Sequence, residues 1–196
     1  MRPTKHIFTI FVLTLILTSL ACTIFVGGPD YSSLPTIPVS TEITQSIQDE
    51  VARAFEEGMT TGTVTMSFTE AQLTSYIASR LQNDPDMQQD NKPLIIDPQV
   101  YLRDGQMQIY GTTQQGMFKA NIGIIVSVGV DENGQPEIDI VSADFGPLPA
   151  PEGLRDAISA MVREAYTGSL GPVATGLRIE TISIADGIMT ISGRIR

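Results

Sequence analysis

Histidine, cysteine and tryptophan are almost absent from this chain of 196 residues, which has one His, one Cys and no Trp. They are His6 and Cys22, so neither an imidazole nor a thiol follows residue 22. Without these groups the rest of the chain cannot carry out Ser-His-Asp or Cys-His catalysis, nor form the His- or Cys-rich sites that Zn, Cu and haem need. We therefore expect a protein that is not an enzyme and that has no cofactor and no bound metal.

Basic residues are also scarce, with 12 Lys and Arg against 22 Asp and Glu, a net charge of -10. Arg2 and Lys5 lie near the N-terminus, so the remainder carries 10 basic and 22 acidic residues, a net of -12. An acidic chain without a Lys/Arg cluster is not expected to bind nucleic acid or to dock electrostatically on anionic lipid. With nucleic acid and anionic lipid excluded as partners, we expect a neutral or apolar partner.

The N-terminus has the order of an export signal. Two positive charges in residues 1–5 precede an uncharged apolar run at residues 7–17, and small residues lead to Cys22. Cys22 after Ala21 resembles the lipobox of bacterial lipoproteins, although Ser19 and Leu20 stand where a lipobox usually has Leu and a small residue. This resemblance implies that Cys22 is lipidated and becomes the first residue of the mature protein.

The alternative is an uncleaved membrane anchor. Residues 7–26 are 20 residues without a charge, and at about 1.5 Å per residue such a helix spans the ~30 Å hydrocarbon core of a bilayer. Both alternatives place the chain at the cell membrane, lipid-anchored or held by a single N-terminal span, with its domain on the extracytoplasmic side.

Three regions follow from this organisation. Residues 1–22 are the signal peptide with its lipobox, or the membrane anchor. Residues 23–40 are a flexible tether, since the stretch GGPDYSSLPTIPVS is rich in Pro, Gly and Ser. Residues 41–196 are an extracytoplasmic α+β domain.

Periodicity and turn residues predict the elements of this domain. A helix begins near Thr41 and ends at Gly58, and a capping box, Thr69 with Gln72, opens a second helix that ends near residue 82. A third amphipathic helix follows the proline-rich connector, and residues 83–92 form a polar loop. The expected strands are residues 63–68, 100–102, 107–110, 117–130, 137–145, 177–184 and 188–195, and the third helix is residues 152–166. The predicted fold is α+β, a curved antiparallel sheet of about seven strands packed with three helices, after an N-terminal signal helix.

An internal repeat supports this architecture. Residues 100–111 align without gaps on residues 182–193, and both read apolar, x, apolar, x, Asp-Gly, x, Met, x, Ile, x, Gly. Each copy is an Asp-Gly hairpin preceded by an expected amphipathic helix. Common ancestry and the general likeness of such hairpins both explain the match, and either way the pattern predicts two helix-plus-hairpin units that share one sheet.

The strand expected at residues 117–130 carries an unbroken apolar row on alternate positions. Such a row can line a groove for an acyl chain, or it can be the core beneath two helices. The candidate ligand-binding residues come from this row and from the helices expected to face it: Ile122, Ile124, Val126, Val128, Leu73, Ile77, Ile158 and Val162.

Two acidic segments have oxygen-bearing side chains that could suggest a cation site. Residues 83–91 contain three Asp and two Asn but lack the Gly and the closing Glu of an EF-hand loop. Asp131, Asn133 and Gln135 alternate oxygen-bearing side chains, which a tight turn explains. We interpret both segments as solvated loops.

From residue 68 to residue 193 the order of motifs resembles a known group of proteins. The helix FTEAQLTSYI, the hairpin DPQVYLRDGQMQIYG, the long apolar strand, the connector FGPLPAP, a helix and the hairpin IADGIMTISG follow one another. This order resembles the membrane-tethered extracytoplasmic proteins of the YpmS-like and LmeA-like kind, which look like relatives of tubular lipid-binding (TULIP-like) domains. The resemblance implies a curved antiparallel sheet around helices and the binding of a lipid or other apolar small molecule, and it carries over no catalytic residue.

The function expected from the sequence is thus that of a non-enzymatic lipoprotein that binds a lipid or another apolar ligand. The alternative is a scaffold module that binds a protein partner of the cell envelope.

Overall fold

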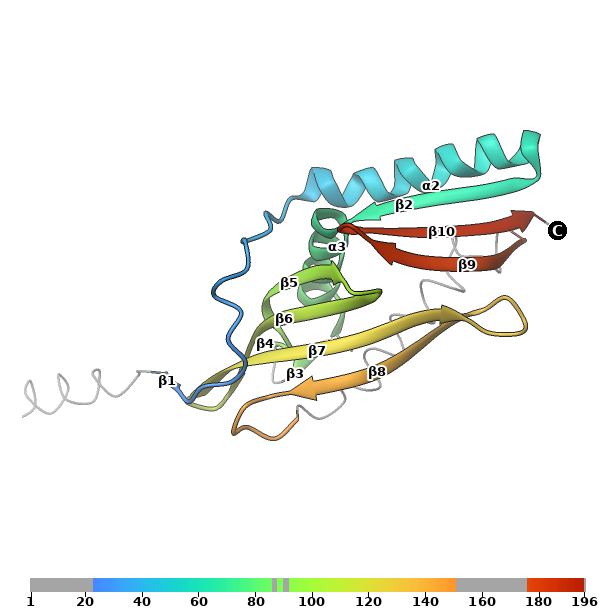
Figure 1. Ribbon diagram of the computed structural model, residues 1–196. Coiled ribbons are helices and arrows are strands. Elements are labelled where there is room, and N and C mark those ends of the chain that lie inside the picture. The colour runs from blue at the N-terminus through green and yellow to red at the C-terminus, as the bar shows by residue number, and fades with distance from the viewer. Residues whose placement is uncertain (1–22, 86–87, 90–91, 151–175, 196) are drawn as a thin grey trace, which may run out of the picture.

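The computed structural model describes residues 23–85, 88–89, 92–150 and 176–195 (Figure 1). These residues form an α+β fold made mostly of strands. The helices are α2 (Thr41–Thr61) and α3 (Glu70–Asn83). The strands are β1 (Ile24–Phe25), β2 (Thr63–Thr69), β3 (Gln88–Gln89), β4 (Lys92–Pro93), β5 (Ile96–Arg103), β6 (Gln106–Gln115), β7 (Phe118–Val130), β8 (Pro136–Asp144), β9 (Leu177–Ala185) and β10 (Ile188–Ile195). The predicted signal helix and the third predicted helix, residues 152–166, lie outside the described residues.

The strands form a strongly curled arrangement rather than one antiparallel sheet (Figure 1). One sheet has the order β1-β7-β6-β5 with β8 on β7, a second has the order β2-β10-β9, and β3 pairs with β4. The sheet is mixed because β1 runs parallel to β7. The prediction of a single antiparallel sheet shared by two helix-plus-hairpin units is therefore wrong, since hairpin β5-β6 and hairpin β9-β10 pair with different neighbours. Local hairpin signals do not specify which distant strand completes each sheet.

Helix α2 lies close to β2 and is longer than its sequence pattern predicts. It continues through Gly58 to Thr61, and Gly62, with a φ of 78°, adopts the left-handed conformation that ends it and donates to the Gly58 carbonyl. Gly58 is buried against β2, where a Cβ would lie 2.4 Å from Cγ2 of Val64. Gly58 therefore permits the close approach of helix and strand instead of stopping the helix.

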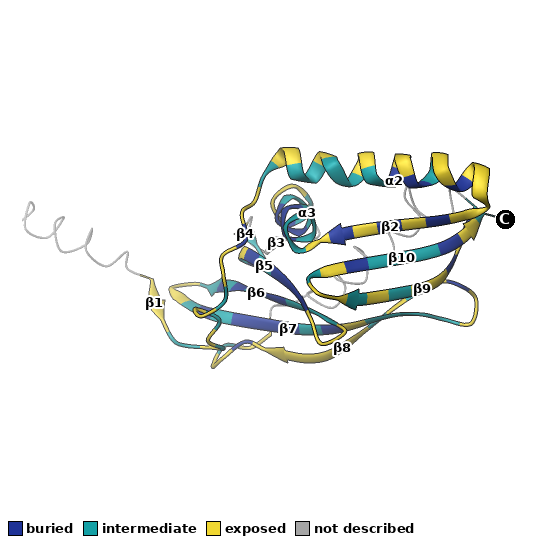
Figure 2. Ribbon diagram, turned by 45° about the horizontal axis from the view of Figure 1, so that its top comes forward, coloured by how far each residue is buried: buried dark blue, intermediate teal, exposed yellow. Residues whose placement is uncertain are grey.

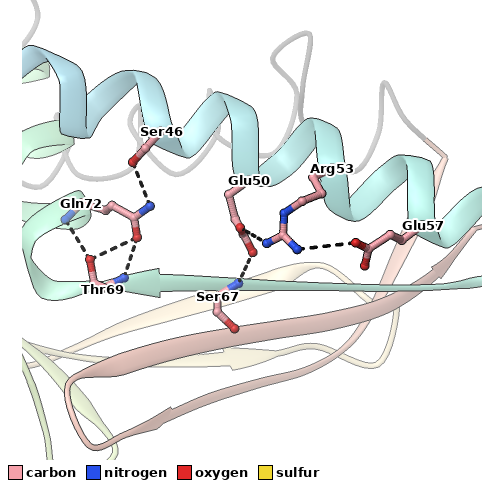
Figure 3. A network of polar contacts seen from close by, with 7 residues as sticks. All are labelled: Ser46, Glu50, Arg53, Glu57, Ser67, Thr69 and Gln72. Carbon is pink, nitrogen blue, oxygen red and sulfur yellow. Dashed lines mark hydrogen bonds and ion pairs between the residues drawn. The ribbon is translucent and has the colours of Figure 1, made fainter.

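Polar side chains join α2 to β2 and α3 (Figure 3). Glu50 accepts a hydrogen bond from the backbone N–H of Ser67 on β2 at 3.3 Å and forms an ion pair with Arg53. Gln72 of α3 donates to Ser46 of α2 at 3.0 Å. Since β2 is an edge strand of its sheet, the Glu50 carboxylate pairs a backbone donor that the sheet leaves open.

Side chains of helix α3 likewise accept hydrogen bonds from backbone N–H groups of β5, the edge strand of the larger sheet. The capping box at its start is confirmed. Thr74 accepts from the backbone N–H of Val100 at 3.0 Å, and Glu70 accepts from that of Leu102 at 2.8 Å. Both donors are in fully buried residues, where an unpaired N–H would cost about 1–3 kcal/mol. These bonds fix α3 over the sheet and place its apolar stripe.

The segment expected to be a tether is extended, but it lies against the domain. Strand β1 pairs with the start of β7, with the Ile24 N–H donating to the carbonyl of Met117 at 2.7 Å. The Gly27 carbonyl accepts from the backbone N–H of Asn121 at 2.8 Å. Strand β1 thus pairs with residues 118–119 of β7, and β8 pairs with residues 123–130.

The second half of this segment is held by side chains of β5. Ile37 is buried, and the Gln99 side chain accepts from its N–H at 2.6 Å and donates to its carbonyl at 3.3 Å. The hydroxyl of Tyr101 donates to the carbonyl of Pro35 at 3.0 Å. Residues 24–40 therefore reach α2 along the surface of the sheet.

Tyr101→Phe is expected to lower the free energy of unfolding by about 1 kcal/mol at pH 7, because the Pro35 carbonyl loses its partner. Burial, followed by the charge of Glu70, raises the pKa of Tyr101 above its ordinary value. The Tyr101 hydroxyl therefore ionises at a lower pH in the unfolded chain than in the folded one. Its contribution to the free energy of unfolding is complete below pH ~10 and is lost as the pH rises through the folded-state pKa. Urea denaturation of the full chain at pH 7 and at steps above pH 9 measures both effects.

Tyr31→Phe is the matched control, because Tyr31 stacks on Tyr110 with ring centroids 5.3 Å apart and its ring is retained. We expect a change within about 0.5 kcal/mol at pH 7. Equal losses in the two variants would contradict the assigned role of the Tyr101 hydroxyl.

Candidate functional site

The candidate site is the apolar inner face of the larger sheet. Ile122, Ile124 and Val126 of β7 are at most 1% exposed and pack with Ile77 of α3 in one cluster. The remaining buried members of this cluster are Leu81, Leu94, Ile95, Val100, Ile109 and Phe145. Leu73 and Val128 are partly buried against it. Six of the candidate ligand-binding residues are therefore brought together, and Ile158 and Val162 lie outside the described residues.

The same face continues onto β8, which contributes none of the predicted site residues. Ile138 is the pairing partner of Val128, and Ile140 is the partner of Val126. Directly paired residues lie on one face of a sheet, so both isoleucines extend the apolar row. Ile138 is partly buried and Ile140 is 41% exposed. The alternation of these two isoleucines in residues 137–145 was the signal that could have identified them.

Burial is lower on β8 than on β7 along this face. Figure 2 shows the middle of β7 buried and most of β8 exposed. The part of the face beneath α3 is closed core, whereas Ile140 on the same face retains a large solvent-accessible area. Among the described residues, the apolar surface is thus larger than the elements that cover it.

A second apolar cluster lies between α2 and the smaller sheet. Its buried members are Val51, Ala54, Val64, Met66, Phe68, Leu102, Leu177, Ile179 and Met189. Leu73 of α3 and Met107 of β6 pack against both clusters. The two sheets consequently share one continuous apolar interior, joined at these two side chains.

In the part of the chain that the structure describes, no three His, Cys, Asp or Glu residues are placed to hold a metal ion. Asp131 accepts hydrogen bonds from the backbone N–H groups of Gln135 at 2.7 Å and Asn133 at 2.9 Å. These bonds, that of Gln135 most of all, lower the pKa of Asp131. Residues 131–135 therefore form a tight turn, as the sequence pattern indicated.

The other acidic segment is described only in part. Asp84 forms an ion pair with Arg80 at 2.8 Å. Gln88 and Lys92 belong to the short strands β3 and β4, so the predicted polar loop contains a small hairpin. Asp86, Asp90 and Asn91 lie outside the described residues.

Neither α2 nor α3 is long and apolar enough to span a bilayer, and these are the helices that the structure describes. Cys22 and the apolar run before it lie outside that part of the chain. The first described strand begins two residues after Cys22.

Comparison with known proteins yields no relative. No protein-family model matches the chain, and no curated protein or solved structure is similar to it. The function is therefore argued from the residues and their arrangement.

Proposed function

We propose that this chain is a membrane-tethered extracytoplasmic lipoprotein that binds a lipid or another apolar ligand and has no catalytic activity. The observation that carries the proposal is the inner face of β7 and β8, fully buried at Ile124 and 41% exposed at Ile140. An acyl chain laid along Val128, Ile138 and Ile140 would remove that apolar area from water, which is the main driving force for binding such ligands.

The position of β1 supports attachment through Cys22 over an uncleaved anchor. Ile24 is in a strand, so a membrane helix that begins at residue 7 would end by residue 23 and have 17 residues. At about 1.5 Å per residue this helix is ~26 Å long, which is at the lower limit for spanning the ~30 Å hydrocarbon core. A lipidated Cys22 needs no such span.

The contacts of the Glu70 carboxylate support a non-catalytic role for this side chain. Glu70 accepts from the backbone N–H of Leu102 and forms an ion pair with Arg103. Its oxygens are therefore engaged in joining α3 to β5. Together with the lack of His and Cys after residue 22, this favours binding over acid–base chemistry.

A photoreactive fatty acid tests the proposal. The full chain, anchored in phosphatidylcholine vesicles that contain palmitic acid with a diazirine group, is irradiated, and the adducts are mapped by mass spectrometry. We expect adducts on β7 and β8. Ile140→Asp should reduce their yield about tenfold, because a carboxylate on this face would have to be desolvated by the acyl chain.

Ile188→Asp provides a closely matched control. Ile188 is 42% exposed, against 41% for Ile140, and it lies on β10 in the other sheet. Its replacement should leave the adduct yield on β7 and β8 within about twofold, since a surface change away from the site has little effect. Adducts that are absent from these strands, or equally reduced by both variants, would overturn the proposal.

A scaffold role remains the second candidate, and the edge of β8 favours it. Among the described strands β8 pairs only with β7, and Val141 beside Ile140 is 55% exposed. An open strand edge with apolar side chains can accept a strand from another protein. Stoichiometric recovery of an envelope protein cross-linked to β8, without fatty-acid adducts, would favour this role.

A further inference from the structure

Four large apolar side chains are exposed at one end of the described domain. Ile24 and Phe25 of β1 are 48% and 59% exposed. Met117, in the turn before β7, and Phe118, the first residue of β7, are 55% and 42% exposed. Ile24 is paired with Phe118, so the four residues are contiguous, and we name them the end patch. Figure 2 shows β1 as an exposed strand at this end of the molecule.

The end patch surrounds the tip of the sheet. Neighbouring residues of a strand point to opposite faces, so Ile24 and Phe25 of β1 present apolar groups on both sides. Contiguous exposed apolar groups of this kind mark a contact surface. A protein partner with one flat face would cover only one side of this tip. A lipid bilayer into which the tip inserts would cover both sides.

The path of the chain identifies the occupant. Only Thr23 lies between Cys22 and Ile24, and two residue steps of extended chain span at most about 7 Å. The headgroup region of one leaflet is about 5–8 Å thick. If Cys22 carries the lipid anchor, Ile24 lies in or next to the headgroup region. The Ile24 N–H donates to the Met117 carbonyl at 2.7 Å, so the start of β7 lies close to the same region.

The segment after β1 is packed on the domain, so it does not act as a free linker that would hold the domain away from the membrane. Residues 27–40 are bonded to the sheet through Asn121, Gln99 and Tyr101. We propose that the end patch inserts into the interface of the bilayer, so that the domain stands on the membrane tip first. This proposal rests on the membrane tether of the proposed function, and not on its ligand.

The absence of tryptophan makes the proposal directly measurable. The chain has no Trp, so Phe25→Trp or Phe118→Trp introduces a single reporter at the end patch. Met59→Trp is the control, because Met59 is 73% exposed in the last turn of α2. That end of α2 lies at the opposite end of the domain from β1 (Figure 1).

The full-length variants are anchored in phosphatidylcholine vesicles with plain or brominated acyl chains. We expect bromine to reduce the emission of both end-patch reporters about twofold, because interfacial side chains reach ~5–10 Å into the boundary of the acyl chains. The Met59→Trp emission should not change. The same quenching in the Phe118→Trp/Ile140→Asp double variant would show that it does not arise from a brominated lipid bound on the inner face.

Each other outcome overturns the proposal and identifies what failed. A chain that floats with the vesicles but has unquenched end-patch reporters is tethered without docking. A chain that does not float has lost the tether, and the docking with it. Equal quenching of all three reporters excludes a tip-first orientation, and a blue shift that depends on protein concentration without bromine quenching assigns the end patch to a second copy of the chain.

Discussion

Gly193→Ala is expected to destabilise the protein by about 3 kcal/mol, the upper part of the range for overpacked sites. A Cβ at Gly193 would lie 2.3 Å from the carbonyl oxygen of Arg178 and 3.0 Å from its carbonyl carbon. Those atoms belong to the backbone of β9, so the strand itself would have to move. The pairing of β10 with β9 already shifts register between Ser192 and Gly193.

Gly129→Ala is the control for this prediction. Gly129 is in the long strand β7, and a Cβ there would meet no atom within 4 Å. Alanine in a strand costs less backbone entropy than glycine, so we expect a change between zero and about 1 kcal/mol of stabilisation. Urea denaturation of both variants measures the difference. Equal effects would mean that the contact with Arg178 is not what excludes a side chain at residue 193.

The equivalent glycine of the internal repeat has the same environment. A Cβ at Gly111 would lie 2.6 Å from Cγ2 of Ile95 and 2.9 Å from the carbonyl oxygen of Ile96. The register of β5 with β6 also shifts, between Ile96 and Gln99. The last Gly of each copy therefore marks the place where an irregular partner strand approaches its backbone.

Ile124→Ala is expected to cost about 2–5 kcal/mol of unfolding free energy, because it leaves a cavity in a closed core. Ile124 is 1% exposed and packs with Ile77 and Val100 in the cluster beneath α3. Ile140→Ala, on the same face of the sheet, removes the same atoms from a side chain that is 41% exposed. Its cost should stay below about 1.5 kcal/mol, since less apolar area is lost. Urea denaturation of the delipidated full chain checks both values.

This pair of variants separates core from ligand surface. Added fatty acid should raise the free energy of unfolding of the wild-type chain and of Ile124→Ala by the same amount, because a ligand stabilises the folded state that binds it. The rise should be smaller for Ile140→Ala. A large loss of stability in Ile140→Ala without ligand would instead assign residue 140 to the core.

The local elements could be predicted because their signals are short-range. Asp104 and Gly105 both have positive φ, as do Asp186 and Gly187, which is the backbone that a two-residue hairpin turn requires and that Asp-Gly adopts readily. The capping box at Thr69 likewise depends on a residue three positions away.

The candidate site could be predicted only in part. The period of two in residues 118–130 was sufficient to indicate the buried face of β7. It did not reveal that β8 extends this face, because the partner of Val126 is chosen by pairing across the turn at residues 131–135. Nor did it reveal how far burial extends, since this depends on where α3 lies.

The N-terminal segment shows most clearly what a sequence pattern leaves out. Its Pro, Gly and Ser content is that of a free tether, yet Ile37 is buried and Tyr101 holds the Pro35 carbonyl. These partners are more than 60 residues apart in the chain. Composition reports the flexibility of an isolated segment and carries no information about a surface that binds it.

The sequence by itself determined which side chains are missing after residue 22, namely His, Cys and Trp, and it determined the hairpin turns, the helix starts and the alternation of the long strand. Each of these depends on residue type or on neighbours within a few positions. Only the tertiary structure decided which strands share a sheet, that β1 joins β7 in parallel, and that Gly58 and Gly193 face a neighbouring element. Among the described residues it also decided that Ile140, on the apolar face, is 41% exposed. These properties arise from contacts between distant segments, whose close approach no local pattern of residues encodes.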